Sequence, residues 1–110
     1  MANAYKVLGQ TADAFTSAPV DLIPDQDGEV IVSTVVICNR SSAEKTYDLQ
    51  VVPAGETAGD EHYISKDVPV PANDTLFLTL GITLADGDVL KATASTADVS
   101  FSAFGTVITA

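Results

Sequence analysis

The stretch Glu29–Asn39, with the sequence EVIVSTVVICN, constrains the fold more than any other part of the chain. Six of its eleven residues are β-branched aliphatics, which are restricted at χ1 and fit a pleated sheet better than a helix. Because these residues fall on both alternating faces, we expect a central strand that is covered on both sides. One face carries Val30, Val32 and Val36, and the other carries Ile31, Val35 and Ile37.

Further short segments of β type recur along the chain with turn residues between them. They cover residues 4–8, Val20–Ile23, Lys45–Val52, and residues 62–70, 75–84, 88–95 and 99–108. In Lys45–Val52 the residues Tyr47, Leu49 and Val51 lie on one face, and Asp48 and Gln50 on the other. This alternation predicts a half-buried strand.

Proline and glycine refine the positions of these strands. Prolines on both sides of Val20–Ile23, and Pro69 inside residues 62–70, predict edge strands, because proline cannot donate to a sheet ladder. Gly81, inside the long strand expected over residues 75–84, predicts a bulge or the close approach of another backbone. We expect residues 11–19 to form a loop or crossover that Phe15 anchors to the core.

Eight or nine short strands and no convincing helical periodicity predict an all-β fold, an antiparallel β-sandwich or jelly-roll-like barrel. The 110 residues are expected to form one domain, residues 1–110. The acidic, glycine-containing segment 53–61 is expected to be an exposed and flexible loop. The apolar C-terminal run 105–110 is expected to be the final core strand rather than an extension onto a neighbouring subunit.

The charge of the chain limits the classes of partner. Fifteen acidic and five basic residues give a net charge of −10, which disfavours nucleic acid and anionic membranes as partners. The same charge suits a solubilising surface, and it also suits a basic partner surface. No apolar run approaches 18 residues and the first residues lack a signal-peptide pattern, so we expect neither a membrane span nor secretion by such a signal.

No residue is assigned a catalytic, cofactor-binding or metal-binding role. Cys38 is the sole cysteine and is expected to be a buried free thiol. The acidic loop 25–29 resembles the opening of a calcium loop but lacks the closing glutamate, and turn chemistry explains it equally well. The adjacent residues Asp60, Glu61 and His62 are read as the start of a strand, in which alternation keeps them from converging on one ion. Whether the acidic loops 25–29 and 56–61 bind a metal or a basic partner stays open.

Enzymes and glycan-binding modules are both disfavoured. The chain has one histidine, one cysteine and no recognisable nucleophile, phosphate-loop or zinc motif, so no enzyme is expected. Tryptophan is absent and aromatic residues are few, which counts against a platform for stacking sugars.

Six segments together resemble a known family. They are residues 2–10 (ANAYKVLGQ), 36–40 (VICNR), 53–55 (PAG), 62–64 (HYI), 72–84 (ANDTLFLTLGITL) and 100–105 (SFSAFG). In these segments the chain resembles small virion structural proteins of tailed bacteriophages, many of them from marine and cyanobacterial phages. The similarity extends over most of the chain, and the last two segments are its most specific part. The acidic loops 25–29 and 56–61 depart from the family.

The resemblance implies a β-sandwich assembled in many copies on a virion, without catalytic or cofactor residues. Within that class we favour a capsid decoration (cement) protein, a trimer that binds the major capsid protein on the capsid surface after synthesis in the host cytoplasm. The alternatives are a tail, baseplate or fibre-base component that binds other virion proteins and, from another class, a receptor- or glycan-binding module. The N-terminal segment 1–10 is either a docking element or an ordinary first strand.

Overall fold

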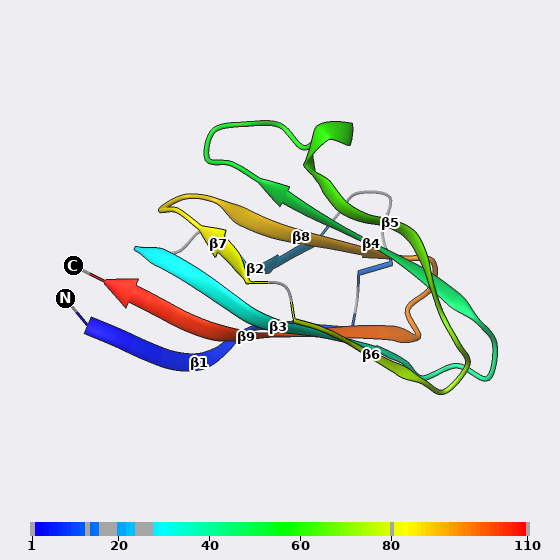
Figure 1. The fold of residues 1–110 in the computed structure, drawn as a ribbon. Coiled ribbons are helices and arrows are strands. Elements are labelled where there is room, and N and C mark those ends of the chain that lie inside the picture. The colour runs from blue at the N-terminus through cyan, green and yellow to red at the C-terminus, as the bar shows by residue number, and fades with distance from the viewer. Residues whose placement is uncertain (1, 13, 16–19, 24–27, 80, 110) are drawn as a thin grey trace.

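The computed structural model describes residues 2–12, 14–15, 20–23, 28–79 and 81–109, which form nine strands and one short 3₁₀ helix (Figure 1). The elements are β1 (Ala2–Thr11), β2 (Val20–Ile23), β3 (Glu29–Asn39), β4 (Lys45–Val52), η1 (Asp60–His62), β5 (Tyr63–Val70), β6 (Thr75–Leu78), β7 (Ile82–Leu84), β8 (Val89–Ala94) and β9 (Val99–Thr109). Expectations that concern residues 16–19, 24–27, 80 and 110 lie outside the described residues.

The strands form two antiparallel sheets in two layers, as Figure 1 shows. The five-stranded sheet has the order β1-β9-β3-β6, with β7 also paired to β3, and the four-stranded sheet has the order β2-β8-β4-β5. The predicted all-β antiparallel sandwich is therefore confirmed. β2 and β5 lie at the two edges of the four-stranded sheet, as the prolines predict. β9 pairs with β1 on one side and β3 on the other, which confirms the C-terminal run as a core strand.

The hydrophobic core fills the space between the two sheets. Both layers contribute to it, and Tyr47 of β4 meets Phe101 of β9 edge-on with ring centroids 6.2 Å apart, a geometry worth about 1 kcal/mol beyond burial. The largest fully buried side chains besides these two are Ile23, Val30, Val32, Val35, Ile37, Leu49, Val70, Leu84, Leu90 and Val99.

β3 is central in its sheet, but the prediction that it is covered on both sides is wrong. Its pairing with β9 shifts by one residue between Val32 and Thr34. This bulge places the apolar residues before and after it on the same inner face, rather than on the two faces expected from strict alternation. The buried residues are Val30, Val32, Val35 and Ile37. On the opposite face no strand of the described residues forms a second layer, and Ile31 there is 40% exposed.

Two further expectations for β3 also change. Cys38 points to the open face and is half-buried, so the expected fully buried thiol is wrong. Its neighbour Asn39, at the end of β3, is buried and donates a hydrogen bond to the Val70 carbonyl oxygen at the end of β5 in the other sheet. Opposite the bulge, Gly105 faces β3 so closely that an added Cβ would lie 2.0 Å from the carbonyl oxygen of Ile31.

The long strand expected over residues 75–84 is instead two short strands. β6 pairs with Val35–Cys38 and β7 with Val30–Val32, so both border the same side of β3 at different places. The bulge expected at Gly81 is a full break, because Gly81 has a φ of +63° between the two strands, a conformation that glycine adopts without steric cost.

β1 is longer than expected and passes through Gly9 to Thr11, with a bulge between Val7 and Gly9. Gly9 permits this course, since a Cβ there would lie 1.8 Å from the carbonyl oxygen of Leu22 in the other sheet. The expected anchor Phe15 is 57% exposed, so that prediction is wrong. Ala14 takes its place, fully buried and accepting a hydrogen bond from the Ala94 N–H.

β4 alternates as predicted, with Tyr47 and Leu49 on the core side and Asp48 and Gln50 on the outer side. Gln50 is nevertheless 4% exposed. The reason is that residues 53–62 fold back over the outer side of the four-stranded sheet (Figure 1). The segment predicted to be an exposed and flexible loop is mostly exposed, as expected, but several contacts fix it as a cover on the sheet.

Candidate functional site

The outward side of the five-stranded sheet, opposite the core, is an open surface that we call the outer face. Its members alternate with buried neighbours along each strand, so the register identifies them. On β1 and β9 they are Tyr5, Val7, Gln10, Ser100, Ser102, Phe104 and Thr106, and on β3, β6 and β7 they are Ile31, Thr34, Val36, Cys38, Thr75, Phe77 and Thr83.

Cross-strand rows run across the outer face. In one row Tyr5 of β1 lies beside Thr106, which lies beside Ile31. In another row Val36 lies between Ser102 and Phe77 of the far strand β6. The outer face is thus a flat surface of apolar and small hydroxyl side chains that spans the whole width of the sheet.

Two exposed aromatic residues stand at opposite edges of the outer face. Tyr5 is 82% exposed on β1, and Phe77 is 70% exposed on β6. Val7 and Ile31 are also exposed. Among the strand positions that the structure describes on this face, the one charged residue is Glu29, which lies at one end. Lys6 lies between Tyr5 and Val7 on β1, so strand alternation directs its side chain to the other side of the sheet.

Charged side chains gather instead on the outer side of the four-stranded sheet. Lys91 of β8 bonds to Asp21 of β2, and the Lys66 amine of β5 lies 3.3 Å from the Asp48 carboxylate of β4. The hydrogen bond to Asp48 and then the charge of that carboxylate raise the pKa of Lys66, with a smaller contribution from Asp67. The two broad sides of the sandwich therefore differ sharply in charge.

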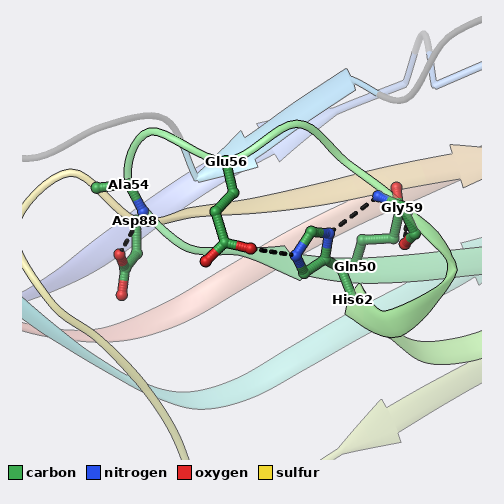
Figure 2. Close-up of polar contacts among 6 residues, drawn as sticks. All are labelled: Gln50, Ala54, Glu56, Gly59, His62 and Asp88. Atoms are coloured by element: carbon green, nitrogen blue, oxygen red, sulfur yellow. Dashed lines mark hydrogen bonds and ion pairs between the residues drawn. The ribbon is translucent and has the colours of Figure 1, made fainter.

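The cover formed by residues 53–62 adds further acidic groups to the charged side. Asp88 accepts hydrogen bonds from the Ala54 and Ala85 N–H groups, at 2.8 and 2.9 Å, which fixes the start of the cover to the β7–β8 turn. Gln50 holds its other end, because the amide nitrogen donates to the Gly59 carbonyl oxygen at 3.1 Å. Figure 2 shows these contacts on the two sides of Glu56.

His62 is the last residue of the cover, and its side chain is buried. Its Nδ1 accepts a hydrogen bond from the Gly59 N–H at 2.9 Å, and its Nε2 lies 3.1 Å from Oε1 of Glu56 (Figure 2). Since Nδ1 is an acceptor here, the neutral ring carries its proton on Nε2 and donates it to Glu56. One ligand atom from each of Glu56, Glu61 and His62 lies within 4.8 Å of the others.

Asp60, Glu61 and His62 were given no metal-binding role because neighbours in a strand face opposite sides. The structure shows that this reason is wrong. The three residues form the 3₁₀ helix η1 and not the start of a strand, which begins at Tyr63. The turn brings Glu61 and His62 together and adds Glu56 from earlier in the cover, while Asp60 stays outside the group. The sequence signal for this group is a histidine six residues after a glutamate, in a segment that contains two glycines. The assumption that these residues belong to a strand led away from it.

The other sequence candidates do not join a site. Residues 25–27 lie outside the described part of the chain, while Gly28 and Glu29 lead into β3. A cavity of about 280 Å³ lies at that end of the sandwich, between Glu29 and Asp88. Its lining has no aromatic side chain to stack on a sugar; it comprises Glu29, Val30, Ile31, Thr83, Leu84, Ala85, Asp88 and Ile108.

Across the described residues no helix is long and apolar enough to span a membrane. We compared the chain with protein-family models, with curated proteins and with solved structures, and none of the three comparisons found a match.

Proposed function

We propose that this protein is a non-enzymatic structural component of a phage virion, and specifically a capsid decoration protein that docks in many copies, as a trimer, on the major capsid protein. The resemblance of its sequence segments to phage structural proteins supports the virion role. The outer face of the five-stranded sheet supports docking, because Glu29 at one end is the one charged side chain among its described strand positions, and this is the observation that carries the proposal.

The outer face suits assembly because the rest of the chain is acidic. A net charge of −10 makes most of the surface unfavourable for close approach to another acidic protein. The outer face reduces this obstacle, since its apolar side chains favour burial and its hydroxyl groups carry no charge, although each needs a hydrogen-bond partner once it is covered. The molecule measures 45 × 28 Å across its broad sides, enough for the roughly 800 Å² per partner that a stable interface buries.

Tyr5 and Phe77 are the expected anchors of the docked state. Exposed aromatic side chains dominate the binding energy of many interfaces when a partner covers them. Tyr5 lies on β1, so the described part of the N-terminal segment 1–10 is a first strand and, in our proposal, also a docking element.

The first experiment counts copies of the chain in purified particles by quantitative mass spectrometry, against the major capsid protein. The proposal expects hundreds of copies. A few dozen or fewer would move the chain to the tail, baseplate or fibre, and none would remove it from the virion and favour a receptor- or glycan-binding module.

The second experiment tests the outer face itself. Phe77→Asp is expected to weaken binding to particles that lack the protein by about 30-fold or more, since loss of a buried interface aromatic costs about 2 kcal/mol or more. Ile64→Asp is the matched control, because Ile64 is 46% exposed on β5 of the other sheet. Equal binding by both variants, with circular dichroism showing intact folds, would contradict docking through the outer face.

A further inference from the structure

We propose that Glu56, Glu61 and His62 form a binding site for a divalent transition-metal cation of the zinc class. The site lies on the cover over the four-stranded sheet, away from the outer face, so it does not depend on the proposed docking role. Because all three ligands belong to the cover, a bound cation would brace the fold of the cover itself.

The distance between the His62 and Glu56 ligand atoms is close to that in a tetrahedral zinc site. Two ligands bound at about 2.0–2.1 Å to a tetrahedral zinc ion are about 3.3 Å apart. Nε2 of His62 and Oε1 of Glu56 are already 3.1 Å apart, so they need to separate by a few tenths of an ångström. Glu61 completes the set within 4.8 Å, and because its side chain is exposed it can move inward by changing rotamer.

The ligand types select the kind of cation. A buried imidazole nitrogen with two carboxylate oxygens suits zinc and its first-row neighbours, whereas calcium and magnesium prefer oxygen ligands throughout. Three protein ligands leave the fourth tetrahedral position to water. The cation would also neutralise charge where Glu56, Asp60 and Glu61 gather.

Binding at Nε2 requires the proton on His62 to move. The cation displaces the proton that Nε2 now donates to Glu56, and the neutral ring then carries its proton on Nδ1, where it needs an acceptor. Gln50 supplies one. Its Oε1 is buried and has no hydrogen-bond partner among the described residues, and its amide ends at Gly59, on the Nδ1 side of the ring (Figure 2).

The exchange also displaces the Gly59 N–H. That group and a protonated Nδ1 are both donors and cannot remain 2.9 Å apart, so the cover shifts locally at Gly59, and the buried Gln50 oxygen gains a donor in return. The proposal thus assigns a role to a buried polar atom that the metal-free arrangement leaves unpaired.

The test is a zinc titration of the full chain followed by NMR of the imidazole nitrogens. His62 is the sole histidine, so its signals are unambiguous. A Cys38→Ser background removes the sole thiol as a competing ligand. We expect a saturable shift of the Nε2 resonance, together with a shift of the Gly59 amide.

Matched variants separate a built site from general attraction to acidic groups. Glu61→Gln is expected to weaken zinc binding by about tenfold or more. Because Glu61 is exposed, this substitution is expected to leave the fold intact. Asp60→Asn changes the neighbouring carboxylate outside the ligand set and is expected to leave affinity within about twofold, as rim charges contribute little. The proposal is overturned if the imidazole signals stay unchanged at about 1 mM zinc, or if Asp60→Asn weakens binding as much as Glu61→Gln.

Discussion

Replacing Asn39 by alanine tests how the two sheets are joined at the end of β3. The two N–H groups of the Asn39 amide are shared among the carbonyl oxygens of Ala43, Val70 and Pro71, which lie 2.9, 3.0 and 3.2 Å from the nitrogen. Its Oδ1 accepts the Ser41 N–H at 2.9 Å. One side chain therefore connects the five-stranded sheet to the loop before β4 and to the end of β5.

The expected loss of stability can be worked out from these contacts. The bond to Val70 is fully buried, and leaving such an acceptor unpaired costs about 1–3 kcal/mol. The other three groups are partly buried, so water replaces Asn39 in part and each costs about 0.5–1 kcal/mol. We expect Asn39→Ala to lower the free energy of unfolding by about 3–5 kcal/mol, a large share of the roughly 5–15 kcal/mol of a typical domain.

Urea unfolding followed by circular dichroism measures this loss. Asn39→Asp provides the sharper comparison, because it keeps the shape but directs a carboxylate at three carbonyl oxygens, and it should be less stable than Asn39→Ala. Gln10→Ala is the control, as it removes one exposed hydrogen bond to Ser102. A loss below about 1 kcal/mol for Asn39→Ala, or an Asn39→Asp variant more stable than Asn39→Ala, would refute this account.

Two further predictions concern β9 and the charged side. Gly105→Ala should lower the free energy of unfolding by about 3 kcal/mol in the same assay, because its Cβ would meet the backbone oxygen of Ile31, which no rotamer change relieves; an unchanged midpoint would contradict this. Asp48 raises the pKa of Lys66 in the folded protein. The contribution of this pair to the free energy of unfolding is therefore complete below the pKa of lysine in the unfolded chain, and it is lost as pH rises through the higher pKa of Lys66 in the folded protein. Asp48→Asn should therefore lower the Lys66 pKa in an NMR titration, and should abolish that alkaline loss of stability.

The sequence predicts the fold class well because strand signals are local. β-branched runs and the alternation in β4 depend on neighbouring residues alone, and the all-β sandwich with β2 and β5 at its edges follows from them. Bulges are different. The shift after Val32 depends on pairing with β9 residues that lie 70 to 73 positions away in the chain, so the sequence could not identify the inner face of β3.

The misplaced anchor and the missed ligand group have related causes. Phe15 is the larger apolar residue, but Ala14 fits the space beside β8 and bonds to Ala94 there, a choice that depends on tertiary packing. His62 lies next to Glu56 because the cover turns back over β4, and Gln50 holds that turn through a contact nine residues away. Neither arrangement has a periodic signal in the sequence.

The edges of the two sheets limit how copies of this chain can associate. β2 has four residues, β5 contains Pro69 and a kink at Asp67 with a φ of +52°, the β6–β7 edge is interrupted at Gly81, and β1 is bulged near Leu8. Short, kinked or interrupted edges offer no long straight template for adding a strand from another molecule. If copies of this chain are brought close together, as the proposed role requires, such edges disfavour edge-to-edge growth into fibres and leave the broad faces as the surfaces for contact.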